Sequence, residues 1–149
     1  MRKACFGKVV IVLLLMFLPA SASTVEENNI TITGAITNLK EVEKYITEKS
    51  YLQIIFLPPD GNVSGVFYEG QLIYDSKLPK MDIPANGAFT FKIKDLDPGK
   101  YFIVVQYLKR GVDPRLVSKK DNNIPGFEIA EERKTPIIID LGELYIRAP

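Results

Sequence analysis

The chain has 149 residues, no histidine, a single cysteine and a formal net charge of +1 at pH 7. Without histidine it lacks Ser-His and Cys-His nucleophile pairs, and with one cysteine it also lacks the usual ligand sets for zinc or copper. A near-neutral charge gives no basic footprint for nucleic acid. We therefore expect no enzymatic activity, no cofactor or metal, and no nucleic-acid partner.

The first 22 residues have the pattern of a secretory signal peptide. Three basic residues precede an apolar run over residues 9–18, which is too short to span a bilayer. The run ends in Ala20-Ser21-Ala22, the small-residue pattern of a cleavage site. We expect residues 1–22 to be removed, and the only cysteine, Cys5, is removed with them.

The mature chain keeps 16 basic residues (19 − 3) and all 18 acidic ones, a net charge of −2. Since it has no disulfide, it must be stabilised by its hydrophobic core, and its length suits one domain. No later apolar stretch is long enough to span a bilayer. We expect a flexible leader at residues 23–29 and a single domain at 30–149, secreted to the periplasm or outside the cell.

The domain opens with strand, helix and strand patterns. Alternating apolar residues predict a strand at 30–36, where Gly34 indicates a bulge or a second backbone passing close. The charged segment 38–50 fits one or two helical turns, and a loop fits it equally well. An apolar strand at 51–57 follows and ends in the turn sequence Pro58-Pro59-Asp60-Gly61.

The middle of the chain has weaker patterns. Residues 65–75 predict a hairpin around Glu69-Gly70. Residues 76–84 contain two prolines and indicate an edge segment or a connector. Asn86-Gly87, the strongest short hairpin-turn signal, then leads into the central unit of the fold.

The central unit spans residues 86–108. Apolar and polar residues alternate over 89–94, so every second side chain, beginning with Phe89, is expected to point into the core. The turn Asp97-Pro98-Gly99 leads into a second strand at 101–108. The unit is either a β-hairpin or a tight corner.

The C-terminal part begins with residues 109–126, which show no strand period and are predicted to be a long irregular loop. A short strand is expected at 127–130. In the last strand, 136–146, the apolar positions change parity at Gly142, which predicts a β-bulge there. About seven short strands favour an all-β fold, an antiparallel Greek-key β-sandwich of immunoglobulin-like architecture.

Three pieces of the sequence resemble the carboxypeptidase regulatory-like domains, which are small transthyretin-like (prealbumin-like) β-sandwiches. The pieces are ITGAI at 32–36, the central stretch NGAFTF through LDPGKY at 86–101, and IDLG at 139–142. The resemblance implies the fold and no active site. Residues 38–78 depart from the family pattern in being longer and more charged. Hydroxyisourate hydrolases, enzymes of transthyretin-like fold, depend on histidine, which this chain lacks.

Two features indicate a binding surface. If Tyr101, Ile103 and Val105 face the core, then Phe102 and Val104 lie on the outer face of their sheet, where they form a partner surface or are covered by a loop of the same chain. The long loop is basic and suits an acidic partner. The candidate partner-binding residues are Phe102, Val104, Lys109, Arg110, Arg115, Lys119 and Lys120. We expect the partner to be another envelope or secreted protein.

Three alternatives stay open. A carbohydrate-binding module could use Tyr68 and Tyr74, although the chain has no tryptophan for a stacking platform. A carboxylate-based hydrolase needs two acidic side chains across a cleft. Its candidates are Asp95, Asp97 and Asp140. Calcium could bind at residues 60–62 or 121–123, where ordinary Asx turns explain the residues as well.

Overall fold

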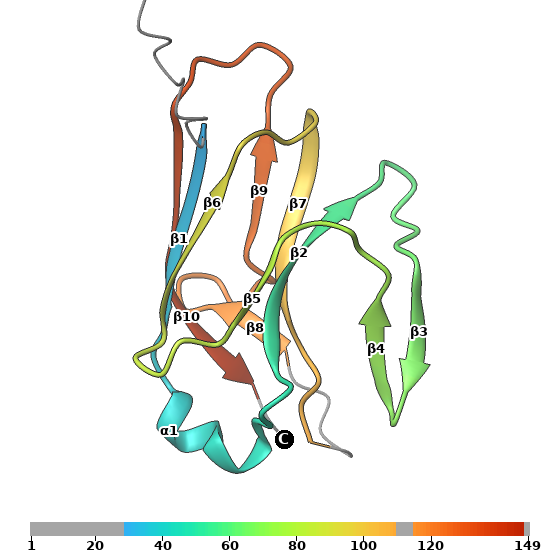
Figure 1. The fold of residues 1–149 in the computed structure, drawn as a ribbon, viewed down its shortest axis with the longest axis vertical. Coiled ribbons are helices and arrows are strands. Elements are labelled where there is room, and N and C mark those ends of the chain that lie inside the picture. Colours follow the sequence, from blue (N-terminus) through green and yellow to red (C-terminus); the bar gives the residue numbers. More distant parts are fainter. Residues whose placement is uncertain (1–28, 110–114, 148–149) are drawn as a thin grey trace, which may run out of the picture.

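The computed structural model describes residues 29–109 and 115–147. The expected signal peptide and residues 23–28 of the leader lie outside this range. The described chain is mostly β-structure, arranged as two four-stranded sheets and a separate two-stranded hairpin (Figure 1). The expectation of an all-β sandwich is confirmed at this level.

The two sheets take their strands from all parts of the chain. Sheet A has the order β6-β1-β10-β8, and its strands are β1 (Ile30–Ile36), β6 (Ala88–Ile93), β8 (Arg115–Ser118) and β10 (Ile137–Arg147). Sheet B has the order β5-β2-β7-β9, and its strands are β2 (Tyr51–Leu57), β5 (Lys80–Asp82), β7 (Gly99–Gln106) and β9 (Gly126–Ile129). The hairpin consists of β3 (Gly65–Tyr68) and β4 (Gln71–Tyr74). The charged segment after β1 forms helix α1 (Leu39–Val42) and the 3₁₀ helix η1 (Glu43–Tyr45), so its helical reading is confirmed.

One strand pair departs from the antiparallel expectation: β1 and β10 run parallel. Parallel neighbours need a long connection between them. These two strands stand at opposite ends of the domain, so the rest of the chain supplies that connection. The remaining ladders in the described part of the chain are antiparallel.

The β-bulge predicted in the last strand is present. Thr33 pairs with Asp140 and Ala35 pairs with Glu143, so β10 has one residue more than β1 between these two pairs. Gly142 supplies the positive φ of 68° at this point. Because of the extra residue, apolar side chains from both halves of β10 pack on the core, as the change in parity predicts. Gly34 of β1 lies against the ring of Phe89. A side chain at this position would clash, because a Cβ there would lie 2.6 Å from the ring.

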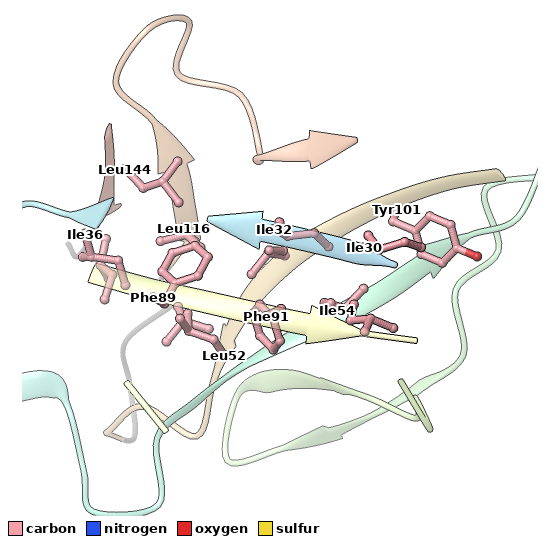
Figure 2. Packing of buried hydrophobic residues seen from close by; sticks show 14 of the residues in the cluster. Ile30, Ile32, Ile36, Leu52, Ile54, Phe89, Phe91, Tyr101, Leu116 and Leu144 are labelled. Atoms are coloured by element: carbon pink, nitrogen blue, oxygen red, sulfur yellow. The ribbon is translucent and has the colours of Figure 1, made fainter. Parts of the chain in front are cut away.

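The core lies between the two sheets. Figure 2 shows Ile32, Phe91 and Leu144 of sheet A facing Leu52 and Ile54 of sheet B. In β6 the buried positions are every second residue from Phe89, as predicted. Burial of each such side chain is worth roughly 1.5–3 kcal/mol. This apolar layer is what a domain without disulfides depends on.

The central unit is a corner and not a hairpin, because β6 belongs to sheet A and β7 to sheet B. The hydroxyl of Tyr101 donates a hydrogen bond of 2.7 Å to the carbonyl of Asp97 and so fixes the corner. Burial raises the pKa of Tyr101, and the Asp97 carboxylate acts in the same direction. From the loop before β10, the Arg133 guanidinium bonds the Leu96 carbonyl and the Asp95 carboxylate.

The Asn86-Gly87 turn also joins the two sheets, since β5 lies in sheet B and β6 in sheet A. It is therefore not the turn of a β-hairpin. Gly87 has a φ of 78°, and its carbonyl accepts a 2.9 Å hydrogen bond from the backbone of Ile36. A Cβ at this position would lie 2.1 Å from the Ile36 carbonyl oxygen. Position 87 of the turn therefore tolerates only glycine.

The prediction of an irregular loop at 109–126 is wrong for residues 115–118, which form β8 and pair with the end of β10. Leu116 and Val117 are both buried, so the strand has no apolar alternation to reveal it. The short strand after the loop and the edge segment before Asn86-Gly87 are confirmed as β9 and β5.

Replacing Gly87 with alanine tests the close contact at the sheet-joining turn. We expect Gly87→Ala to lower the free energy of unfolding by about 3 kcal/mol or more, because it adds a steric clash to the backbone strain. Gly61→Ala is the matched control, since Gly61 has a φ of 73° and open space around its Cβ position. It should cost about 1 kcal/mol. Urea unfolding of both variants measures the difference, and equal losses would contradict this account of the turn.

Candidate functional site

Hairpin β3–β4 stands on the outer face of sheet B. Its turn residues Glu69 and Gly70 have φ values of 49° and 85°, as a two-residue type I′ turn requires. The hairpin predicted at 65–75 is therefore confirmed. In Figure 1, β4 lies on the side of sheet B and β3 is the outermost strand.

The hairpin is attached to sheet B through glutamine side chains. The Gln106 amide, at the end of β7, accepts a 2.9 Å hydrogen bond from the backbone of Tyr74 and donates one of 3.1 Å to the carbonyl of Leu72. On β4, the Gln71 amide binds the N–H and the carbonyl of Leu108 at 3.2 and 2.6 Å. Each amide thus makes the two bonds that a neighbouring strand would make.

A third glutamine extends the attachment to β2. The Gln53 side chain donates a 2.9 Å hydrogen bond to the carbonyl of Ser76, just beyond β4. The three glutamines, named here the glutamine clamp, are all buried. Burying an amide is costly unless it is hydrogen-bonded, so these bonds hold the hairpin in one place. The Oε1 atom of Gln53 has no hydrogen-bond partner among the described residues.

The glutamine clamp was not predicted from the sequence. A signal was nevertheless present, because Gln53 and Gln106 each interrupt a strongly apolar strand. A polar side chain in such a place must find a partner when it is buried. The partners lie on the hairpin or just beyond it, 23 and 32 residues away in the chain, and no local pattern reveals them.

The hairpin covers the apolar residues predicted on the outer face of sheet B. The ring of Tyr74 packs edge-on against Phe102, with centroids 5.7 Å apart. Phe102 and Val104 are half-buried. Of the two alternatives for this face, cover by the same chain is the one found, although the cover is incomplete.

A groove remains between the hairpin and the segment before β9. One hollow, of about 470 Å³, is lined by Phe67, Leu72 and Val104, and the adjoining one, of about 590 Å³, by Phe102. The two hollows share Tyr74 and Ile124 in their linings. We call this feature the hairpin groove, defined by Phe67, Leu72, Tyr74, Phe102, Val104 and Ile124. Its floor is the outer face of sheet B.

The basic residues predicted for partner binding do not gather at the groove. Arg115 lines its first hollow. Lys119 instead forms a salt bridge of 3.2 Å with Glu143, and Lys120 lies with it beside the bulge of β10. Lys109 lies near the end of β7, where its backbone donates a hydrogen bond to Tyr45. Arg110 lies outside the described residues.

The two tyrosines considered for sugar binding project from opposite faces of the hairpin, because the register pairs Tyr68 with Gln71 and Tyr74 with Gly65. They cannot form one stacking platform. Tyr68 contacts the ring of Tyr107, with centroids 6.4 Å apart, and Tyr107 contacts Tyr51 at 5.5 Å. This tyrosine row supports the tip of the hairpin.

Tyr107 is held in an unfavourable backbone conformation, with a φ of 58°. Its carbonyl accepts hydrogen bonds from the hydroxyls of Thr47 and Ser50, at 2.8 and 2.9 Å. These bonds offset the strain and turn the chain out of β7 toward the hairpin. Burial and the neighbouring Tyr107 raise the pKa of Tyr51.

Four of the acidic residues considered for catalysis or metal binding have local structural partners. Asp140 accepts a hydrogen bond from the backbone of Gly142, and Asp95 pairs with Arg133. Hydrogen bonds from Asn62 lower the pKa of Asp60, and those from Asn123 lower the pKa of Asp121, as in ordinary Asx turns. Within residues 29–109 and 115–147, no three His, Cys, Asp or Glu side chains come together in a way that could hold a metal ion.

None of the helices in the described part is long and apolar enough to cross a membrane. No protein-family model matches the chain, and neither the curated proteins nor the solved structures include a significant match. The function is therefore inferred from the geometry and chemistry of the groove.

Gln106→Leu tests the glutamine clamp. The substitution keeps an apolar side chain of similar size but leaves the Leu72 carbonyl and the Tyr74 N–H without their partner, at a cost of about 2–3 kcal/mol. We expect the hairpin to detach while the sandwich stays folded, so limited proteolysis should cut residues 60–75 at least about tenfold faster. Gln53→Leu removes a single bond and should accelerate cleavage less. Unchanged cleavage in Gln106→Leu would show that the clamp does not hold the hairpin.

Proposed function

We propose that this chain is a secreted, non-enzymatic module that binds to or assembles with another protein in the cell envelope or outside the cell. The site is the hairpin groove, which takes an apolar segment of that protein. The observation that carries the proposal is the apolar floor of Phe102 and Val104 on the face of a sheet that is otherwise expected to be wet.

The composition of the groove supports a protein as the ligand. Its centre is apolar and aromatic, and Ile124 on its wall remains 49% exposed. Charged residues stand at its ends, Arg115 in one hollow and Lys100 with Glu128 in the other. An apolar centre with a polar rim is typical of protein–protein interfaces. Among the described residues that line the groove, the only carboxylate is that of Glu128, and a glycosidase needs a pair.

The finer reading of the fold and location belongs to the same proposal. We take the domain to be a Greek-key sandwich of the transthyretin-like kind, related to the carboxypeptidase regulatory-like domains. Two four-stranded sheets, joined by turns that cross from one to the other, support this reading. Secretion rests on the signal-peptide pattern of residues 1–22, and the absence of cysteine after Cys5 agrees with a domain that needs no disulfide.

Site-specific photo-crosslinking tests the proposal. A photoreactive amino acid placed at Ile124 should capture one dominant protein from the host's own envelope or culture fluid, reproducibly. The same amino acid at Ile138, which is 75% exposed on sheet A, is the matched control and should not capture it. Adding Val104→Asp to the Ile124 probe should reduce the capture at least about tenfold, because it places a charge in the apolar floor.

Two results would contradict the proposal. One is capture of the same protein from both positions, which would mean that the groove has no special part in binding. The other is the absence of any protein above background at Ile124 together with retention of the wild-type chain on an isolated envelope polysaccharide.

A further inference from the structure

The outer edge of β3 has backbone groups that face away from the rest of the described residues. On β4, the carbonyl of Leu72 and the N–H of Tyr74 point away from β3, because Gln106 binds both. In the register of the hairpin, Leu72 stands opposite Phe67 and Tyr74 opposite Gly65. In an antiparallel pair such residues direct their N–H and C=O groups outward on both strands. Gly65 and Phe67 therefore present two donors and two acceptors at the free edge.

This edge lacks the protection that the other sheet edges have. Each of the strands β5, β6, β8 and β9 carries a charged residue, respectively Lys80, Lys92, Arg115 and Glu128. Charged side chains at an edge discourage pairing with a further strand. The sequence of β3, GVFY, contains no charge and no proline, and the exposed fractions of Val66, Phe67 and Tyr68 are 65%, 81% and 56%. In Figure 1, β3 lies on the outside of the molecule.

The edge is complementary to itself. If two β3 strands pair in antiparallel fashion with Val66 at the centre, Gly65 of each copy stands opposite Phe67 of the other. Both are outward-facing residues, so the two pairs make four hydrogen bonds and use every free group of the edge. Phe67 then packs over a glycine that has no side chain of its own, an arrangement known to stabilise edge glycines. No charges of like sign face each other within the paired segment.

We propose that β3 is a self-association edge and that its partner is a second copy of this chain. The two hairpins join into one four-stranded sheet, β4-β3-β3-β4, around a twofold axis at Val66. The arrangement closes on itself, because each copy has used its free β3 edge. The pairing uses the backbone edge of β3 and shares only Phe67 with the defined lining of the hairpin groove. Both proposals depend on the position of the hairpin, but self-association is measured without any ligand of the groove, so its failure is distinguishable from failure of the proposed function.

The size of the contact predicts weak association. A four-residue strand buries much less than the roughly 800 Å² per partner of a standard stable interface. We therefore expect a dimer that forms at high protein concentration or under the increased local concentration of an assembly. Tight binding at nanomolar concentration is not expected.

Cysteine crosslinking tests the register. The natural chain has only Cys5, which the signal peptide carries, so Val66→Cys introduces the single cysteine of the mature protein. At the twofold axis, the two Val66 residues form a non-hydrogen-bonded pair. Their Cα atoms then lie about 4.5 Å apart, which is within the range that a disulfide can bridge. Under mild oxidation, Val66→Cys should form a disulfide dimer, and Ile138→Cys, equally accessible, should form far less. Equal yields from the two variants would overturn the proposal.

Sedimentation velocity over a wide concentration range tests the association without a crosslink. The wild-type protein should show a dimer at high concentration, and Phe67→Lys should weaken its formation at least about tenfold. Ile138→Lys, the same kind of change on sheet A, should leave it unaltered. Phe67→Pro is a second variant, which removes an outward N–H and spares the bonds to β4. A protein that stays monomeric at about millimolar concentration, or a dimer that persists in both Phe67 variants, would rule out pairing through β3.

Discussion

Three buried amides determine how the outer half of this molecule is arranged. Gln53, Gln71 and Gln106 lie in apolar surroundings and are bound to backbone groups across the boundary between sheet B and hairpin β3–β4. Leaving a buried amide or a strand edge without partners costs more than forming the bonds gains. The hairpin therefore has one low-energy position, although few of its side chains reach the main core.

Both proposed surfaces follow from that position. Because Gln106 binds β4 by its edge, the hairpin stands edge-on on the outer face of sheet B and does not lie flat on it. A hairpin packed with its face against sheet B would cover Phe102 and Val104 completely. The hairpin held by its edge leaves the groove between Tyr74 and Ile124. The same attachment satisfies the inner edge of the hairpin and leaves the outer edge of β3 without a paired strand in the described part of the chain. A single set of hydrogen bonds thus creates both the groove and the free edge on which the two proposals rest.

Local patterns predicted the sandwich well where burial alternates. Strand β6 and the bulge at Gly142 follow from the spacing of apolar residues, and the outward position of Phe102 follows from the same rule. Strand β8 was missed, because both Leu116 and its neighbour are buried. The parallel pairing of β1 with β10 and the closure of the clamp depend on contacts between distant residues, which no short window of sequence contains.

The candidate site was predicted only in part for the same reason. Phe102 and Val104 were recognised as outward-facing, but the walls of the groove come from the hairpin and from the segment before β9, which approach only in the folded chain. The basic residues looked like one patch because they are close in sequence. In the fold, Arg115 and Lys119 lie at opposite ends of β8 and its turn, at different hollows.

The most direct test of this account is an NMR measurement of the side-chain amide protons of Gln71 and Gln106 in the wild-type protein. If the clamp holds the hairpin, these protons exchange slowly with water, and those of Gln106 show nuclear Overhauser contacts with the backbone amide of Tyr74. If they exchange as fast as the amide protons of an exposed glutamine and show no contact with β4, the hairpin is not attached in this way, and both the groove and the free edge of β3 lose their basis.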